Sequence, residues 1–485
     1  MYAPHIRLVI GIALGMTLLA ALGWLQLRHD RMVPSDATHV FEGLSGPSQS
    51  TMVPLPSPTT ATKYAKGSPS RLAVLLTDSS ASWLSPAHGL KAIGVPFLIT
   101  QDFAEALTHQ VVLVYPSISG KLLSSEALQA LAAFPRAGGT LIGSQVLGGG
   151  LNEVFGYQEA VASRQRFEVR FTPDTPLVAS FTDPRERTLR LGNREKTPEA
   201  FGTYGYTQST NPIATYEDGL AAVTHKSYGK GQAYAIGLDL GFLFSKGYNN
   251  RGEDITWSYN NRFDPTIDVW LRLLKAIYQA GEPAAVTIGT VPFGKSLSVM
   301  LTHDVDFTQS MANAVTYAEY EKSQELVATY FIQTKYIRDY NGDIFFDDQG
   351  VTYLKRIEKL GMEIGSHTVA HSGGFSLFPV GPGTEQYPSY VPFVKDRKTA
   401  YNGTILGELR VSKFLLEHFS GHTVVSFRPG HLSNPVALPQ ALQATGYRYS
   451  SSTTANNSLT HLPYQLNYDR FGEEQMNLVE FPITV

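Results

Sequence analysis

The first pattern along the chain is a long apolar run. From Leu8 to Leu27 the segment LVIGIALGMTLLAALGWLQL carries no charged side chain. As a helix, a run of this length spans about 30 Å, the thickness of a bilayer core. The flanking cations, Arg7 and Arg28, lie on both sides and do not fix an orientation. We predict that residues 1–30 form a transmembrane anchor, with a cleaved signal peptide as the alternative.

The next stretch has no hydrophobic period. Residues 31–70 are rich in Pro, Ser, Thr and Gly, as in SGPSQSTMVPLPSPTT. Such a composition buries too little apolar area to offset the conformational entropy lost on ordering. We predict a disordered linker over residues 31–70 that tethers the folded part to the membrane.

From residue 71 the pattern alternates between two periods. Short apolar runs, such as RLAVLL, QVVLVY and TLIGS, alternate with helical spacing, as in SSEALQALAAF. Strands alternating with helices predict a parallel sheet covered by helices. We expect residues 71–285 to form a Rossmann-like or flavodoxin-like α/β domain, closed by a helix over PTIDVWLRLLKAIYQAG.

The element order of this domain and its GKGQAYAIG stretch resemble the glutamine-amidotransferase-like and trehalose-utilisation-like α/β domains. An amidotransferase needs a cysteine nucleophile, and the chain contains no cysteine. We therefore interpret residues 71–285 as an accessory domain without a catalytic cysteine, either a scaffold or a carbohydrate-facing module.

Composition excludes several other classes of function. The 485 residues are 17% charged with a formal net charge of -3, so no excess of basic residues indicates a nucleic-acid partner. Without cysteine the chain has no disulfides and no thiolate metal ligands.

Two carboxylates follow an apolar segment at LTHDVDF. We predict a buried strand through Leu297, Val299 and Leu301 that ends at Asp304 and Asp306. Residues two apart in a strand point the same way, so the two carboxylates lie beside each other. They repel unless a cation lies between them or one keeps its proton, and a solvated pair is the alternative.

Histidines and an arginine follow later in the chain. His367 and His371 have an H-x-x-x-H spacing, which on one helical turn places both imidazoles on one face. Solvent-facing histidines are the alternative. Two histidines and one carboxylate suit Zn²⁺, with Co²⁺, Ni²⁺ or Fe²⁺ as other possibilities. Arg428 follows the apolar VVSF, where it is placed to pair with one of the aspartates.

Taken together, the motifs THDVD, HTVAH and RPG resemble those of the polysaccharide deacetylase domain (NodB homology, carbohydrate esterase family 4). The resemblance covers residues 290–485 and implies a distorted (β/α)7-type barrel with its site at the carboxyl ends of the strands. A truncated domain is an open alternative, because the sequence ends in the strand-like NLVEFPITV.

The same resemblance implies a role for each matching residue. Asp306, His367 and His371 would be the metal ligands. Asp304 would be the general base for the attacking water, and Arg428 would orient it. The chain departs from the family pattern at His303, where the family often has an aromatic residue, and at the late general acid, for which His461 is the available candidate.

We therefore expect a metal-dependent carbohydrate deacetylase, a hydrolase of carbon–nitrogen bonds other than peptide bonds. Its expected substrate is a hexosamine-containing polysaccharide, either peptidoglycan or an exopolysaccharide, and an O-acetyl ester remains open. The alternative is a catalytically impaired carbohydrate-binding or polymer-export accessory protein. The expected location is an inner or plasma membrane, anchored through the N-terminal helix with the folded domains outside the cytoplasm, or secreted after signal cleavage.

Overall fold

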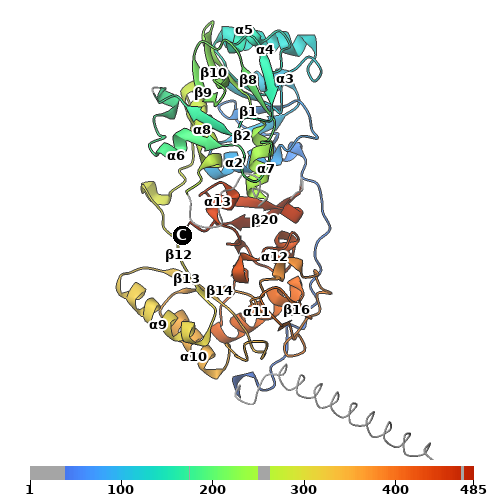
Figure 1. The fold of residues 1–485 in the computed structure, drawn as a ribbon, viewed down its shortest axis with the longest axis vertical. Coiled ribbons are helices and arrows are strands. Elements are labelled where there is room, and N and C mark those ends of the chain that lie inside the picture. Colours follow the sequence, from blue (N-terminus) through green and yellow to red (C-terminus); the bar gives the residue numbers. More distant parts are fainter. Residues whose placement is uncertain (1–38, 174, 250–262, 471–473, 485) are drawn as a thin grey trace, which may run out of the picture. The chain divides into compact units, whose positions relative to one another are not determined.

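The computed structural model describes residues 39–484 except 174, 250–262 and 471–473 (Figure 1). The chain divides into two compact units. The α/β unit comprises Leu55–Ser298 and the chain from Thr453 onward. The other unit comprises Val299–Ser452 and residues 39–54, and we call it the motif unit because it carries the three motifs.

The α/β unit is built on one mixed sheet. Its order is β2-β1-β3-β4-β11-β10-β9-β6-β7, with β8 pairing β10 and β5 pairing β8. Pairing is parallel from β2 to β11 and antiparallel beyond, so the predicted parallel sheet covers only its first part. The strands are β1 (Leu72–Leu76), β2 (Phe97–Thr100), β3 (Val111–Tyr115), β4 (Thr140–Ser144), β5 (Ala160–Ser163), β6 (Glu168–Phe171), β7 (Thr188–Arg190), β8 (Thr203–Tyr206), β9 (Pro212–Tyr216), β10 (Ala221–Tyr228) and β11 (Gly231–Ile236).

Helices connect and flank these strands, and two of them lie over SSEALQALAAF and PTIDVWLRLLKAIYQAG, where the sequence predicts helices. They are α2 (Leu84–Ile93), α3 (Phe103–Ala106), α4 (Ser125–Ala137), α5 (Asn152–Phe155), α6 (Pro184–Arg187), α7 (Leu240–Tyr248), α8 (Thr266–Gly281) and α13 (Ala455–Ser458). Helix α4 begins after Ser124, whose side chain accepts the Ala127 N–H at 3.1 Å, and ends at Gly138. The predicted closing helix is α8, and most of its residues are buried.

The end of the chain packs within the α/β unit. Strands β19 (Tyr464–Asn467) and β20 (Gln475–Glu480) form an antiparallel pair. Lys91 of α2 donates to Gln465 at 3.1 Å, and the Tyr64 hydroxyl donates to Gln475 at 2.5 Å. The predicted range 290–485 therefore differs from the unit defined by contacts, because these side chains join the last residues to α2 and its neighbours.

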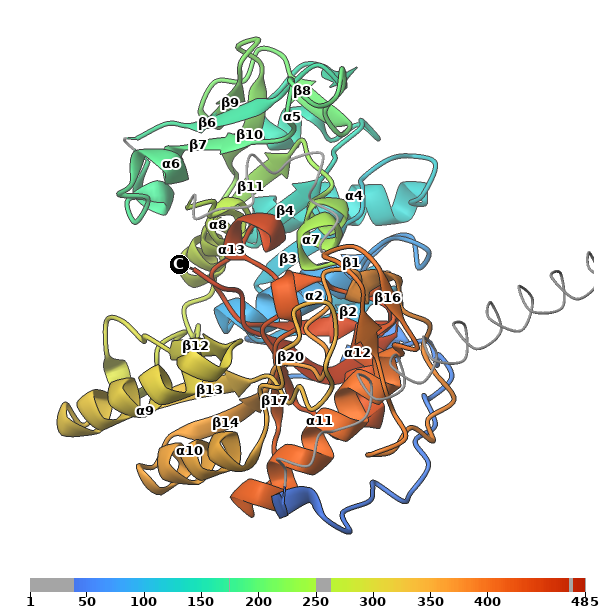
Figure 2. The ribbon, with the colours of Figure 1, turned by 60° about the horizontal axis from the view of Figure 1, so that its bottom comes forward.

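The motif unit contains parallel strands separated by helices. The strand order is β12-β13-β14-β17-β18, and each neighbouring pair is parallel. Helices α9 and α10 lie side by side next to β12–β14 (Figure 2). The elements are β12 (Leu301–Val305), α9 (Thr308–Ser323), β13 (Ala328–Ile332), α10 (Asp348–Lys359), β14 (Glu363–Ser366), β15 (Phe393–Val394), β16 (Ala400–Tyr401), α11 (Ile405–Ser420), β17 (Ser426–Phe427), α12 (Leu438–Ala444) and β18 (Tyr449–Ser450).

The start of the first motif strand differs from the prediction. Strand β12 begins at Leu301, and the apolar residues before it are exposed: Leu297 by 71%, Val299 by 67% and Met300 by 60%. The prediction of a buried strand through Leu297 is therefore wrong. Hydrophobicity alone does not bury a segment, because burial also requires a neighbouring element to cover it.

Residues 39–54 form an ordered segment that we call the strap. The Gly46 N–H donates to the Tyr387 carbonyl at 3.2 Å, and the Thr51 N–H donates to that of Gly383 at 2.8 Å. Arg410 of α11 donates to the Gln49 carbonyl at 2.7 Å. The predicted disordered linker is therefore wrong over residues 39–54, where backbone hydrogen bonds and one buried guanidinium compensate for the entropy of ordering.

Phe41 anchors the strap in the motif unit. It is 4% exposed, and its ring lies 5.0 Å from that of Phe419 and 5.5 Å from that of Tyr387. We expect Phe41→Ala to destabilise the unit by about 3 kcal/mol, since truncating a buried aromatic leaves a cavity. Urea unfolding measures this, with Val40→Ala as the matched control, because Val40 is 40% exposed. Equal midpoints for both variants would show that the strap does not support the unit.

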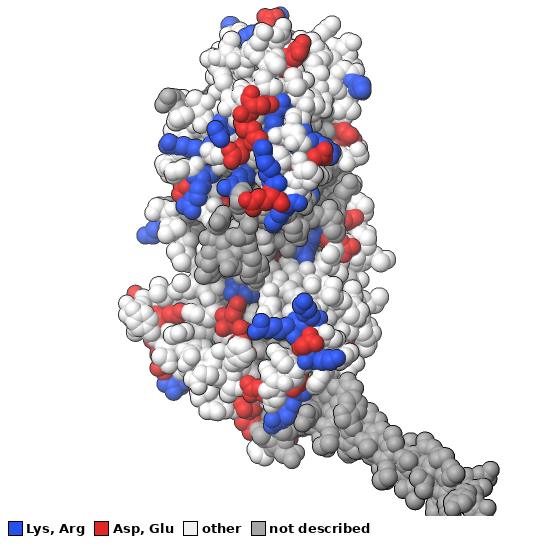
Figure 3. All heavy atoms as spheres, viewed as in Figure 1, with Lys and Arg blue, Asp and Glu red and all other residues white. Residues whose placement is uncertain are grey.

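Basic and acidic side chains are interspersed on the face shown in Figure 3. Among the described residues, no helix combines the length and the apolar character needed to cross a bilayer. The segment predicted as an anchor, within residues 1–30, lies outside the described residues.

Candidate metal centre

The predicted site residues gather at the carboxyl ends of neighbouring parallel strands. Asp304 lies in β12, and Asp306 follows its last residue. His367 follows β14, and Arg428 follows β17. Parallel strands end at the same edge of a sheet, so residues distant in sequence meet there. The structure thus brings together all five residues that the motifs single out.

Asp306 and the two histidines form a compact group of metal-ligand type. The Asp306 Oδ1 atom lies 3.1 Å from His367 Nε2 and 3.3 Å from His371 Nε2. One ligand atom from each residue lies within 4.8 Å of the others. Oδ1 is buried and has no hydrogen-bond partner of good geometry among the described residues. A buried carboxylate oxygen facing two imidazole nitrogens is the donor set that a divalent cation satisfies.

The charge state of Asp306 fits this arrangement. Burial by itself would raise the pKa of its carboxyl group, but the adjacent imidazoles of His367 and His371 hold that pKa well below its usual range. The carboxylate is therefore ionised at neutral pH, as a metal ligand must be.

A hydrogen bond to the backbone orients His367. His367 is buried, and its Nδ1 atom lies 2.8 Å from the Arg428 carbonyl oxygen. A carbonyl oxygen can only accept, so Nδ1 carries a proton, and Nε2 is the nitrogen left to present a lone pair to a cation. This is the arrangement that metal-binding histidines use, with the outer hydrogen bond fixing both ring orientation and tautomer.

The two histidines lie on a loop rather than on a helix. Residues 367–371 follow β14 without helical hydrogen bonding. Thr368 has φ 71° and His371 has φ 50°, and the Thr368 Oγ1 atom accepts the His371 N–H at 3.0 Å. The prediction of a shared helical turn is therefore wrong. The imidazoles still converge, because a tight left-handed turn folds His371 back towards Asp306.

Asp304 and Arg428 form an ion pair beside this group. Arg428 Nη1 donates to Asp304 Oδ1 at 2.7 Å. The guanidinium also donates to Thr302 Oγ1 at 3.0 Å and Ser451 Oγ at 2.9 Å, and it stacks over the Phe331 ring. The Arg428 side chain is 5% exposed and that of Asp304 is 38% exposed. The arginine is thus fixed from several sides, while the carboxylate it holds stays accessible.

Gly430 and His431, which follow Arg428 closely in the sequence, complete the surroundings of the ligand group. The motif analysis assigned neither of them a role. The His431 ring centroid lies 4.5 Å from that of His371. Burial, together with the neighbouring His371, lowers the pKa of His431. Gly430 lies against His371 so closely that an added Cβ would meet the imidazole Cδ2 at 2.6 Å. The RPGH sequence contains both residues, but only the fold shows that they lie against His371.

This close approach yields a test of the packing around His371. We expect Gly430→Ala to displace the His371 ring and to weaken zinc affinity by about 10-fold or more, as changes next to a ligand do. Gly202→Ala is the control, because an added Cβ there has no atom within 4 Å. Isothermal titration with Zn²⁺ compares the two, and unchanged affinity in Gly430→Ala would contradict the described position of His371.

The structure gives the contacts of His303 and His461, the two histidines at which the chain departs from the family pattern. His303 stacks on Tyr330, and its Nε2 atom lies 2.6 Å from Glu321 Oε1, so it belongs to a side-chain cluster between β12, β13 and α9. His461 lies in the α/β unit, where its Nδ1 atom is 3.1 Å from Asp268 Oδ2. Each of the two histidines therefore pairs with a carboxylate of its own unit.

Comparison with known proteins identifies the motif region. Residues 294–450 match the family model described as polysaccharide deacetylase. The three motifs and the five site residues lie within this range. A search of curated proteins gave no match. Residues 294–450 therefore form a polysaccharide deacetylase domain of the NodB-like kind.

Solved structures give more distant likenesses. A family 4 carbohydrate esterase from Streptomyces lividans in complex with acetate is 18% identical, with 32% of this chain and 62% of that one covered and a TM-score of 0.22. A CE4 family pseudoenzyme from Bacillus anthracis is 14% identical, with 30% and 38% covered and a TM-score of 0.19. The Xyl-CE4 domain of a xylanase from the hindgut metagenome of Trinervitermes trinervoides is 16% identical, with 29% and 52% covered and a TM-score of 0.21. The chain thus spans less than two thirds of each of these proteins.

Proposed function

We propose that the chain is a metal-dependent deacetylase that removes N-acetyl groups from a hexosamine-containing polysaccharide. One observation carries the proposal. The three-residue ligand group of Asp306, His367 and His371 lies beside an accessible Asp304 held by Arg428, at the strand ends of a polysaccharide deacetylase domain.

Asp306, His367 and His371 would hold the cation. Two imidazoles and one carboxylate suit Zn²⁺ and leave positions for other ligands, and Co²⁺, Ni²⁺ and Fe²⁺ also accept this donor set. When bound, such a cation lowers the pKa of water and polarises a carbonyl oxygen. The tautomer set by the Arg428 carbonyl keeps His367 Nε2 available for it.

Asp304 would accept the proton of the attacking water. Arg428 binds its Oδ1 atom, so we place the proton on the other carboxylate oxygen, Oδ2. The paired guanidinium fixes the direction of the Asp304 carboxylate, which a general base requires. Arg428 itself is anchored by Thr302, Ser451 and Phe331, so we expect it to stay in place during turnover.

The substrate and the location extend the proposal. Peptidoglycan and an exopolysaccharide both carry N-acetylhexosamine, and both lie outside the cytoplasm. An anchor within residues 1–30 would hold the chain at the membrane next to such a polymer, whereas a cleaved signal would release it. An O-acetyl ester is a related substrate, because the same attack on a carbonyl carbon serves esters.

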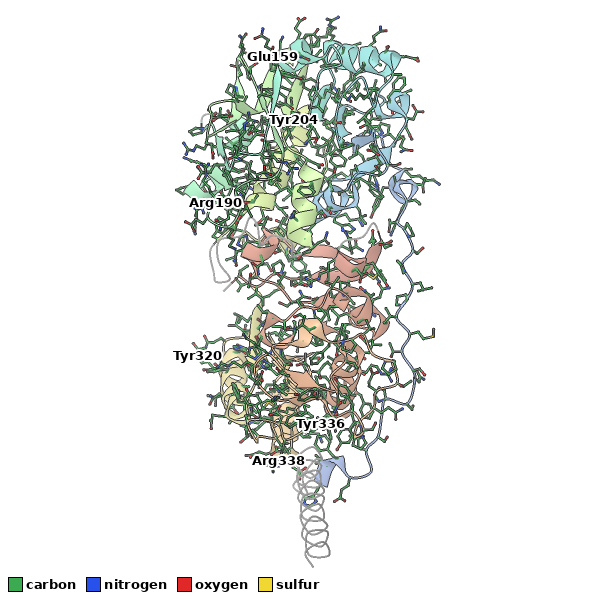
Figure 4. All side chains as sticks on the ribbon, turned by 45° about the vertical axis from the view of Figure 1, so that its right-hand side comes forward. Glu159, Arg190, Tyr204, Tyr320, Tyr336 and Arg338 are labelled. Carbon is green, nitrogen blue, oxygen red and sulfur yellow. The ribbon has the colours of Figure 1, made fainter. Side chains whose placement is uncertain are left out.

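A cavity favours a second candidate function, that of a carbohydrate-binding accessory protein. It lies in the α/β unit, has a volume of about 480 Å³ and is lined by charged, amide and aromatic side chains, among them Glu168, Arg190, Phe263, Asp264 and Asn456. Figure 4 labels Arg190. A cavity of this size accommodates a saccharide unit, and its lining offers hydrogen-bond donors and acceptors. Binding of a polymer there would not require the metal centre.

Mass spectrometry of reacted glycans separates the two functions. The zinc-loaded chain is incubated with chitin-like oligomers, peptidoglycan fragments and an O-acetylated glycan. Loss of acetyl groups from any of them supports the deacetylase, and the glycan that reacts gives the substrate class. Retention of every acetyl group, together with measurable glycan binding by the zinc-loaded chain, would support the accessory function instead.

A further inference from the structure

Glu408 is a buried carboxylate that has no part in the mechanism above. It lies in the first turn of α11 (Ile405–Ser420) and is 1% exposed. Its Oε2 atom accepts the N–H groups of Val369 and Ala370, each at 2.8 Å. Its Oε1 atom accepts the Tyr390 hydroxyl at 2.8 Å. One carboxylate thus binds the middle of the loop that runs from His367 to His371.

This loop needs an external partner to keep its shape. Thr368 and His371 have positive φ angles, a backbone conformation that L-residues other than glycine rarely adopt. Val369 and Ala370 are buried, so their N–H groups would lose water without a replacement acceptor. Glu408 is that acceptor for both groups, and the histidines at the two ends of the loop depend on the conformation it stabilises.

Glu408 is itself held by a rigid surrounding. The Tyr390 hydroxyl also accepts the Thr404 N–H at 3.1 Å, and Thr404 caps α11 through the Gly407 N–H. The Tyr336 hydroxyl donates to the Tyr390 carbonyl, and Figure 4 labels Tyr336 in this unit. The carboxylate is therefore fixed to the start of a sixteen-residue helix.

Burial at this position is energetically unfavourable for the ionised carboxylate of Glu408. Burial raises the pKa of Glu408 to about 7, although the hydrogen bonds from Ala370, Tyr390 and Val369 act in the opposite direction. A buried acid with this penalty suggests a role other than filling the core, since an apolar residue fills space without it.

We propose that Glu408 is a positioning residue that sets the distance and direction of His367 and His371 for metal binding. The inference rests on the proposed function for the identity of the ligands. Glu408 acts through the backbone of Val369 and Ala370 and touches neither the cation nor the substrate. Loss of the carboxylate should weaken metal affinity by about 10–100-fold, the range found for outer partners of metal ligands.

The test compares Glu408→Ala and Glu408→Gln with a matched control. Glu385→Gln is the control, because the Glu385 side chain is 7% exposed and contacts Thr404 and Arg410 rather than the histidine loop. Zinc affinity is measured by chelator competition, and the visible spectrum of the Co²⁺-loaded chain reports the ligand geometry. We expect Glu408→Ala to lose affinity and change the cobalt spectrum, Glu408→Gln to restore much of both, and Glu385→Gln to change neither.

Several outcomes would overturn the proposal. A folded Glu408→Ala chain with wild-type zinc affinity and cobalt spectrum would do so, and so would equal losses in Glu385→Gln. Where Glu408→Ala does not fold, Tyr390→Phe removes one partner of the carboxylate, and an unchanged cobalt spectrum in that variant would also count against it. If the wild-type chain binds zinc but releases no acetate, only the deacetylase proposal is refuted. The zinc affinity and the cobalt spectrum of the Glu408 variants still test the positioning role.

Discussion

His367→Ala is expected to abolish both stoichiometric zinc binding and acetate release. The imidazole is buried and supplies Nε2 at 3.1 Å from Asp306 Oδ1, so its removal leaves two of three ligands. We expect zinc affinity to fall by more than about 100-fold, beyond the range seen for outer partners. Metal content after dialysis and acetate release both report it.

The control for this variant is another histidine in the same unit. His422 is exposed and its Nε2 atom pairs with Glu358 at 2.7 Å, away from the ligand group. His422→Ala should keep one zinc per chain and the wild-type rate. If His367→Ala retained tight zinc binding, the metal would have to lie elsewhere, and the ligand assignment would be wrong.

Asp304→Asn is expected to separate chemistry from metal binding. The amide keeps the size of the side chain but does not accept a proton at neutral pH, so kcat should fall by about 10²–10⁴-fold. Zinc affinity should stay close to wild type, because Asp304 is not one of the three grouped ligands. Steady-state rates at saturating zinc and a parallel zinc titration measure the two effects.

A second aspartate provides the comparison for Asp304. Asp396 is exposed and accepts the N–H groups of Lys398 and Thr399 at a turn. Asp396→Asn should leave kcat unchanged. A kcat for Asp304→Asn within a few-fold of wild type would exclude Asp304 as the base, and lost zinc binding would show that it acts as a ligand instead.

Much of the site was predictable because its residues follow strands. Asp304, Asp306 and Arg428 each come at or just after an apolar run, and His367 follows the strand MEIGS. In a parallel α/β arrangement, a residue that follows a strand lies at the edge of the sheet where the carboxyl ends of the strands meet. The local pattern placed these residues at strand ends, and the resemblance of the three motifs to the polysaccharide deacetylase domain brought them into one site.

The local conformation between the histidines was not predictable in the same way. An i, i+4 spacing fits a helix, but Thr368 and His371 adopt left-handed φ values that few non-glycine residues take. They do so because Glu408, about forty positions later in the sequence, supplies acceptors for the loop. A contact between distant residues overrides a local preference, and spacing alone contains no record of it.

The strap shows the same limitation. Its Pro-, Ser- and Gly-rich sequence is typical of a linker, and its order comes from Phe41 and from the Arg410 guanidinium on a distant helix. Conversely, the apolar residues Leu297 and Val299 predicted a buried strand, yet both side chains are exposed. Both errors arise where burial depends on which element lies nearby.

The most direct test of the account is a zinc titration of the metal-free chain, with acetate release from an N-acetylglucosamine oligomer measured at each step. We expect no release without metal and a rate that rises to a plateau at one zinc per chain. Release that is independent of zinc, or one tightly bound zinc with no release from any acetylated glycan, would contradict it.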